Sequence, residues 1–251
     1  MRCLWELLIQ RISNFSIDKL TLLSQSKITL MKTRIIFLLV LAIVGIYVSF
    51  KIKTSNENKK VLPVFNPIDM KEEMVDSSIQ RVGYGHTIGD FSFLNQDGKT
   101  ITQEDVKGKV FVAEYFFTTC GTICPRMNKQ MQRVQKQFAN NPKVKIVSFT
   151  VMPEVDTVEQ MKLYATGHKA ISGQWHFLTG DKKELYSLAR KSFFVLKPAE
   201  AENLGDAGSD FIHTNNFVLV DQDLQIRGYY DGTSAKDVSV LLKDIELLMN
   251  K

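Results

Sequence analysis

Two cysteines separated by three residues are the strongest chemical signal in the sequence. Cys120 and Cys124 lie between an apolar run typical of a buried strand and a run with helical periodicity. Backbone N–H groups and the helix macrodipole favour the thiolate at such a junction, and the thiolate attacks disulfides or binds soft metals. On one helical turn, their Cα atoms would lie about 6 Å apart, which suits a disulfide or a shared metal ion. The spacing leaves both chemistries open.

A histidine is the commonest further ligand for a transition metal in a protein, and the chain has four. His86, His168 and His176 lie in a turn, at the end of a predicted helix and on a predicted strand. For these three, packing or a surface position is the simpler interpretation. His213 differs because it follows a loop rich in acids and glycine and directly precedes a predicted strand at 216–220. We therefore choose His213 as the candidate third ligand.

Other potential ligands fit structural roles better. Met127 and Met131 recur with Val134 and Phe138 at steps of four, three and four, which places them on one apolar helical face. Core packing is therefore the preferred interpretation of both methionines. Four acids lack the spacing of a calcium loop and are interpreted as solvated: Asp206, Asp210, Asp221 and Asp223.

The elements around the cysteines alternate between strand and helix. A hairpin is predicted at 91–102, and the apolar run 110–117 is typical of a central strand covered on both faces. Further strands are predicted at 145–151, 175–178, 216–220 and 225–230. Helices are predicted to follow Cys124, Asp156, Asp181 and Ser234. This order indicates an α/β class and a thioredoxin-like fold with an N-terminal hairpin extension.

The N-terminal part predicts a membrane anchor. Residues 35–50 carry no charge and are flanked by lysine and arginine. A cleaved signal peptide is the alternative, but no small-x-small site follows the run. We divide the chain into an N-terminal extension (1–34), an anchor (35–52), a linker (53–80) and a thioredoxin-like domain (81–251). Because Met31 is an alternative start, residues 1–30, with Cys3, need not be translated.

Charge separates the anchor region from the body. Residues 1–60 carry 10 Lys and Arg against 3 Asp and Glu, whereas residues 61–251 carry 22 against 24. The slightly acidic body argues against a nucleic-acid partner. Six basic residues precede the apolar run and four follow it closely, which favours an inside N-terminus. We expect a bacterial inner-membrane protein with its domain in the periplasm; the mitochondrial inner membrane is the alternative.

The segments around the two cysteines and around His213 together make the chain resemble the SCO/SenC family. The likeness runs from about His86 to the C-terminus, through the segment Phe116–Pro125 and, about ninety residues after the cysteines, His213–Asp221. The resemblance implies a membrane-tethered domain that binds copper, as Cu(I) or Cu(II), through Cys120, Cys124 and His213. It also implies a metallochaperone that helps to assemble the copper centre of cytochrome c oxidase. The implied partner is the copper-bearing oxidase subunit or another copper chaperone.

Three positions depart from the family pattern, and one alternative function stays open. Gly121, Ile212 and Met152 stand where the family often has proline, an acid and aspartate, respectively. None of them removes an implied ligand. The alternative is an enzyme, a thiol–disulfide reductase in which Cys120 attacks and Cys124 resolves the mixed disulfide. In the copper chaperone, oxidation of the two thiols to the redox-active disulfide Cys120–Cys124 would release the metal.

Overall fold

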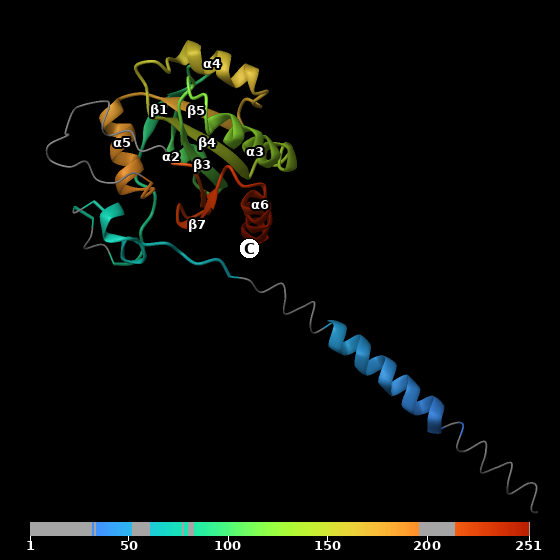
Figure 1. Cartoon of the computed structure of the whole chain (residues 1–251). Coiled ribbons are helices and arrows are strands. Elements are labelled where there is room, and N and C mark those ends of the chain that lie inside the picture. Colours follow the sequence, from blue (N-terminus) through green and yellow to red (C-terminus); the bar gives the residue numbers. More distant parts are fainter. Residues whose placement is uncertain are drawn as a thin grey trace, which may run out of the picture. The chain divides into compact units, whose positions relative to one another are not determined.

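Seven strands form one mixed sheet in the computed structural model, which describes residues 32, 34–51, 61–76, 78–79, 83–195 and 214–250. Their order across the sheet is β2-β1-β5-β4-β3-β6-β7 (Figure 1). The bounds are β1 (Ser92–Asn95), β2 (Thr100–Thr102), β3 (Val110–Phe116), β4 (Val144–Thr150), β5 (Trp175–Thr179), β6 (Asn216–Val220) and β7 (Ile226–Asp231). The parallel strands β3, β4 and β5 lie in the middle, and an antiparallel hairpin extends the sheet on each side.

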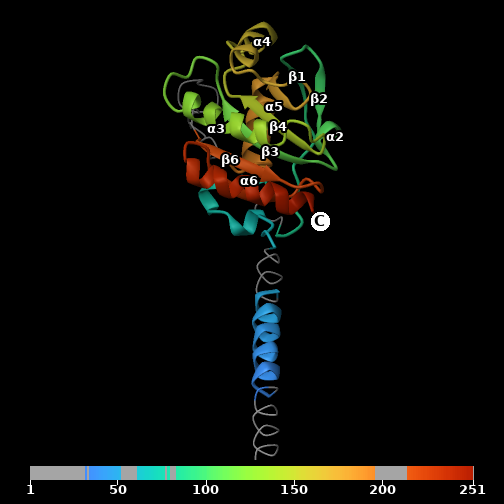
Figure 2. The ribbon, with the colours of Figure 1, turned by 90° about the vertical axis from the view of Figure 1, so that its right-hand side faces the viewer.

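Helices cover both faces of this sheet. The bounds of the main helices are α3 (Cys124–Gln137), α4 (Val158–Gly167), α5 (Lys182–Lys191) and α6 (Ala235–Met249), and a short α2 (Gln103–Val106) follows β2. The apolar residues of α3, α4 and α6 share one core, whereas those of α5 belong to a second core on the other face. Figures 1 and 2 show α3 and α6 side by side. Every residue of β3 is buried, as its mostly apolar sequence predicts.

The side-chain caps of the helices agree with the sequence in two cases and differ in one. Asp181 and Ser234 cap α5 and α6 by accepting hydrogen bonds from the backbone N–H groups of Glu184 and Asp237. The cap predicted at Asp156 is wrong. Thr157 caps α4 instead, because its hydroxyl accepts from the Gln160 N–H at 3.3 Å. The Asp156 carboxyl group is engaged elsewhere, as described below.

The segment 61–76, which the sequence assigns to the linker, packs against β7. The Phe65 N–H donates to the Ile226 carbonyl at 2.9 Å, and the Phe65 and Tyr229 rings meet edge to face. Arg227 donates to the carbonyl groups of Leu62 and Pro63. Two short 3-10 helices, Pro67–Asp69 and Glu72–Met74, follow. Because most of these contacts involve the backbone, the side-chain pattern gives no sign of them.

Arg227 also corrects the interpretation of the acidic residues after β6. Asp221 is buried and pairs with Arg227 at 2.7 Å, so its assignment as a solvated residue is wrong. Its other oxygen accepts from the N–H groups of Asp223 and Gln225 and shapes the β6–β7 turn. Asp223 itself is exposed. Asp206 and Asp210 lie outside the described residues.

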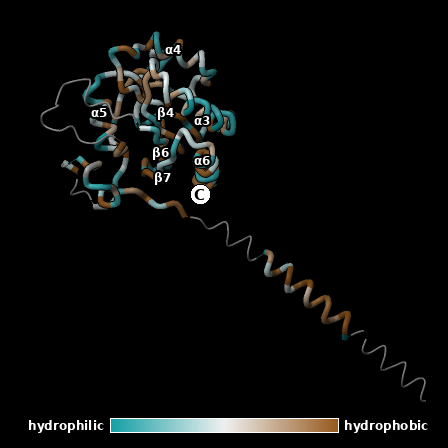
Figure 3. The backbone as a smooth tube through the Cα atoms, in the orientation of Figure 1, coloured by the Kyte–Doolittle hydropathy of each residue, from teal (hydrophilic) through white to brown (hydrophobic). Residues whose placement is uncertain are grey.

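The N-terminal helix belongs to a separate unit of residues 1–60. It runs from Arg34 to Lys51 and has a mean hydropathy of 2.1, and Figure 3 colours most of it as hydrophobic. Its apolar side chains are exposed. By length and composition it is able to cross a membrane. The described residues from 61 onward form the second unit, which holds the cysteine pair.

Candidate functional site

The two cysteines stand at the junction between β3 and α3. β3 ends at Phe116, and α3 begins at Cys124, with Pro125 in its first turn. Ile123 occupies the N-cap position and offers no side-chain acceptor. The Cys124 N–H instead points at the Cys120 sulfur, 3.4 Å away. The sulfur therefore takes the place of a capping oxygen and lies where the helix macrodipole favours negative charge.

Hydrogen bonds stabilise the thiolate form of Cys120. Burial raises the pKa of its thiol, but hydrogen bonds from the backbone and thiol of Cys124 and from Thr122 outweigh this effect and lower the pKa to about 6. The Thr122 Oγ1 atom lies 3.7 Å from the sulfur. Cys120 keeps 9% of its surface exposed. Cys120 is therefore largely buried, but its lowered pKa favours the thiolate at neutral pH.

Cys124 has the opposite character. It is 1% exposed and packs in the core beneath α3. Burial raises the pKa of its thiol, and the hydrogen bond to Cys120 together with the charges of Cys120 and Glu114 raises it further. Neither cysteine is in a disulfide. The pair thus combines a reactive outer thiolate with an inner thiol that holds its proton.

Glu114 lies in the middle of β3 on the same strand face as Phe116. It is 1% exposed, and burial raises the pKa of its carboxyl group to about 7 although it accepts a hydrogen bond from Ser148 at 2.6 Å. Its second oxygen has no hydrogen-bond partner among the described residues. A single acid within an apolar strand run is the sequence signal that points to Glu114, and our sequence analysis did not use it.

Asp156 supports the loop that leads from β3 to the cysteines. It is fully buried, and its oxygens accept from the Thr118 backbone at 3.2 and 3.3 Å and from the Thr118 hydroxyl at 2.5 Å. The Thr150 hydroxyl, at the end of β4, also donates to it. Gln160 adds a contact to Thr118 from α4. These bonds tie the loop before Cys120 to β4 and α4.

The three histidines of the described residues have partners away from the sulfurs. His86 Nε2 lies 2.9 Å from the Ser192 carbonyl oxygen, and its ring packs on Phe194. His168 contacts the Tyr164 carbonyl and Asn128. For His86 and His168, these contacts agree with the packing interpretation.

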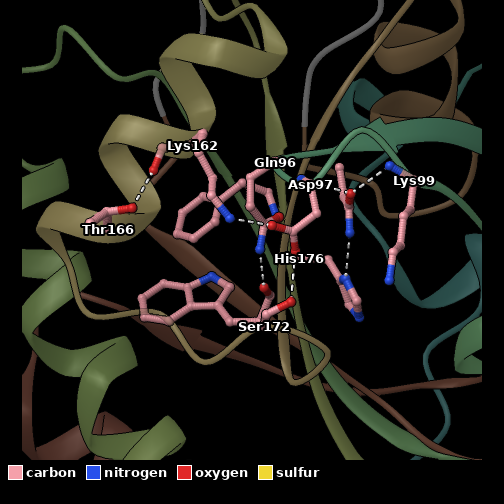
Figure 4. Close-up of polar contacts among 10 residues, drawn as sticks. Gln96, Asp97, Lys99, Lys162, Thr166, Ser172 and His176 are labelled. Atoms are coloured by element: carbon pink, nitrogen blue, oxygen red, sulfur yellow. Dashed lines mark hydrogen bonds and ion pairs between the residues drawn. The ribbon is translucent and has the colours of Figure 1, made fainter.

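His176 belongs to a polar cluster at the β1–β2 hairpin (Figure 4). Its Nδ1 atom lies 3.3 Å from the Asn95 amide, whose oxygen accepts from the backbone of Asp97 and Lys99. Asp97 in turn pairs with Lys162 of α4 at 2.5 Å. Burial lowers the pKa of His176, and the nearby Lys145 lowers it further. His176 therefore serves the hairpin, as its packing interpretation predicts.

His213 lies outside the described residues, but the structure places the start of the strand that follows it. β6 runs antiparallel to β3, with Val218 opposite Ala113. The chain therefore enters β6 at the end of the sheet where β3 gives way to the cysteine loop. Among the described residues, no group of three His, Cys, Asp or Glu side chains could hold a metal ion. A third ligand of these types must come from another part of the chain or from a partner.

This arrangement supports two kinds of chemistry. Two neighbouring sulfurs are soft donors that suit Cu(I), and the exposed loop residues on either side of Cys120, Thr119 and Gly121, would let a partner approach to take the ion. The same asymmetry suits thiol–disulfide exchange, because an outer thiolate attacks and an inner thiol resolves. Met127 and Met131 are fully buried in the core, so their assignment to packing is confirmed.

Comparisons with known proteins help to choose between copper binding and thiol–disulfide exchange. A family model described as SCO1/SenC matches residues 80–250. The SCO1 protein homolog of Bacillus subtilis (strain 168) is 36% identical over 159 residues, which cover 62% of this chain and 79% of the relative. A protein of Stutzerimonas stutzeri named as copper-binding is 28% identical over 144 residues, 57% of this chain and 68% of that protein.

A solved structure extends the comparison to the fold. BsSco is described as a member of the Sco family of cytochrome c oxidase assembly proteins, with a disulfide switch. It matches with a TM-score of 0.55 and 34% identity, over 65% of this chain and 93% of that chain. The predicted thioredoxin-like α/β fold is confirmed by this likeness.

Proposed function

Because the chain belongs to the SCO1/SenC family, we propose that it is a copper chaperone that helps to assemble the copper centre of cytochrome c oxidase. The observation that carries this proposal is the pair of free cysteines Cys120 and Cys124 at the start of α3, in which hydrogen bonds lower the pKa of the Cys120 thiol. Relatives named for copper binding and for oxidase assembly support it. Copper is the cargo of such a protein.

The copper ligands that we propose are Cys120, Cys124 and His213. The two sulfurs supply soft donors for Cu(I), and an imidazole adds affinity for Cu(II). β6 begins at Asn216, three residues after His213, and its start lies at the same end of the sheet as the cysteine loop, which supports this choice. Because binding requires both thiols to lose their protons and the imidazole to be neutral, copper affinity should fall in acid.

A copper chaperone must act in the compartment in which its recipient takes up copper. We propose that the helix Arg34–Lys51 is a single membrane anchor and that the domain acts in the bacterial periplasm, with the mitochondrial inner membrane as the alternative. The proposed recipient is the copper-bearing subunit of the oxidase or another copper chaperone. The loop around Cys120 is exposed at Thr119, Gly121 and Thr122, which would let such a recipient approach.

Copper titration of the reduced full-length chain in nonionic detergent tests the proposal. We expect one copper per chain and an absorption band from thiolate-to-Cu(II) charge transfer. His213→Ala should lower copper affinity by about two orders of magnitude, whereas His86→Gln, on the other side of the sheet, should leave it unchanged. Equal copper binding by His213→Ala and the parent protein would refute the three-ligand site.

A thiol–disulfide reductase is the second candidate, and the unequal pKa values of the two cysteines favour it. The Cys120 thiolate would attack a target disulfide and release one target thiolate. Cys124 would then attack the mixed disulfide, release the second target thiol and leave the Cys120–Cys124 disulfide. The target gains the two electrons that the pair loses, and an external dithiol must reduce the pair again.

The two candidates differ in their dependence on His213. As a reductase, the His213→Ala protein should reduce a test disulfide at nearly the rate of the parent protein. A full-length chain that reduces the disulfide but takes up no copper would favour the enzyme.

A further inference from the structure

The helix that starts at the cysteine pair carries an unusual distribution of charge. α3 has four basic residues and no acid, and we call these four the basic stripe: Arg126, Lys129, Arg133 and Lys136. Their steps of three, four and three keep them within about 80° of one another around the helix axis. The buried residues of α3, such as Met127 and Met131, lie on the opposite face. The basic stripe therefore faces away from the core.

The basic stripe has no acidic partner among the residues that the structure describes. The ion pairs resolved elsewhere join other cations to acids, such as Lys162 to Asp97 and Lys182 to Glu154. Arg133 donates only to neutral groups on α3 and α6, at 2.6 to 3.1 Å. The charge of Arg126 contributes to the lowered pKa of Asp231, but the Asp231 oxygen accepts hydrogen bonds from Thr233 and Asn215 and forms no ion pair with Arg126. The positive charge of the stripe is left for solvent or for a partner.

This distribution opposes local stability. The helices α4, α5 and α6 each have an acid in the first turn, where the macrodipole favours negative charge. α3 has no acid there and has Arg126 instead. Neighbouring cations on one helical face also repel each other. Local rules broken without a compensating contact are typical of functional surfaces.

The rest of the domain is acidic, so the positive charge of the basic stripe differs in sign from its surroundings. The 22 Lys and Arg of residues 61–251 include the four of the stripe, which leaves 18 against 24 Asp and Glu elsewhere. A basic surface on an otherwise acidic domain repels general cations and attracts an acidic surface to one place. Figures 1 and 2 show α3 at the outside of the domain, with α6 beside it.

The basic stripe begins in the first turn of the helix that follows Cys120. Arg126 follows Cys124 by two residues, and the exposed residues Thr122 and Pro125 connect the stripe to the rim around Cys120. We propose that the basic stripe is the docking surface for an acidic face of a protein partner, which brings the partner's own sulfur groups to Cys120. The proposal rests on the exchange of copper or electrons with a protein described under Proposed function.

An anionic membrane surface is the other occupant that the charge would suit, but the position of the stripe argues against it. Lipid headgroups along α3 would cover the rim at Thr122 and Pro125 and close access to Cys120. A protein face can instead place its reactive group over the sulfur while its acids contact the stripe. Charge complementarity of this kind raises association rates, typically by 10-fold to 1000-fold.

The test measures the rate at which Cys120 attacks two charged probes. Both are short synthetic peptides whose single cysteine is a mixed disulfide with thionitrobenzoate. One peptide carries a run of glutamates, and the other has glutamines at the same positions. Attack of the Cys120 thiolate on the peptide sulfur forms the protein–peptide disulfide and releases coloured thionitrobenzoate. The reaction uses the copper-free full-length chain, so its result does not depend on copper binding; Cys3→Ser is present in every protein compared.

The matched variants reverse two charges on each side of the domain. Lys129→Glu with Lys136→Glu changes the basic stripe, and Lys183→Glu with Lys191→Glu changes exposed lysines of α5 on the opposite face. We expect the parent protein to react about 10-fold faster with the glutamate peptide than with the glutamine peptide at low salt. About 0.5 M salt should remove the difference. The α3 variant should lose or reverse the preference, and the α5 variant should keep it.

Three results would overturn the proposal. The first is a parent protein without preference for the glutamate peptide, and the second is an α3 variant that keeps the preference with an unchanged melting temperature. The third comes from the parent protein in nanodiscs. If it reacts more slowly with the glutamine peptide in phosphatidylglycerol nanodiscs than in phosphatidylcholine nanodiscs, the basic stripe binds the membrane. Normal copper uptake beside any of these results would reject the docking surface and leave the proposed function standing.

Discussion

Alkylation of the copper-free protein should distinguish the two cysteines by their dependence on pH. Only the thiolate reacts with iodoacetamide, so the rate at each cysteine follows its ionised fraction. Cys120 has a lowered pKa because the Cys124 and Thr122 groups donate hydrogen bonds to its sulfur. Cys124 has a raised pKa because it is buried beside Cys120 and Glu114. We expect Cys120 to react across the whole range from pH 5 to pH 8 and Cys124 to stay unmodified.

The size of the effect follows from the pKa of about 6 at Cys120. With that value, about 9% of the thiol is ionised at pH 5 and about 99% at pH 8, so the rate should rise about 11-fold. For free cysteine, with a pKa of about 8.5, the same interval raises the rate about 750-fold. Because steric access affects both ends of the interval equally, the partial burial of Cys120 does not alter this ratio.

Peptide mapping by mass spectrometry assigns the modified sulfur and separates Cys120 from Cys3 and Cys124. Thr122→Val removes a hydroxyl 3.7 Å from the Cys120 sulfur and should make the dependence on pH steeper. An increase of several hundred-fold at Cys120 between pH 5 and pH 8 would refute the hydrogen-bonded thiolate. Faster modification of Cys124 than of Cys120 would refute the assignment of outer and inner sulfur.

Three further substitutions test the groups around the site and the sheet edge. Glu114→Gln should become more stable relative to the parent protein as the pH rises from about 4.5 to 7, by up to about 3 kcal/mol, because the unfolded chain releases the Glu114 proton before the folded chain does. Denaturant unfolding of both proteins at pH 5 and pH 8 measures this change. The same difference in free energy of unfolding at both pH values would contradict the prediction. Asp156→Asn places an amide donor against the donors of Thr118 and should cost about 1–3 kcal/mol and slow the alkylation of Cys120 at pH 5. Arg227→Met leaves Asp221 buried without its cation and should lower the free energy of unfolding by about 3–5 kcal/mol. A variant as stable as the parent protein would contradict this prediction.

The sequence alone determined the order of the elements and the position of the cysteine pair between a strand and a helix. Mostly apolar runs predict β3 and β4 because such runs indicate burial on both faces, and apolar repeats of three and four predict α3 because they indicate one buried face. The caps at Asp181 and Ser234 are likewise local, since each accepts from a backbone N–H three residues away. The likeness around the cysteines was sufficient to identify the family, which the comparisons confirm.

Tertiary structure decided which polar groups meet and how the two cysteines differ. Asp156 resembles a helix cap in sequence, but the fold brings Thr118 to it from 38 residues away. Asp221 resembles a turn residue, but β7 brings Arg227 beside it within the core. The cysteines carry the same side chain, and only their depth and hydrogen bonds make one a thiolate and the other a protonated thiol. Local patterns record which residues face a core, whereas burial and pairing of charges depend on contacts between distant segments, and these also set the chemistry of the site.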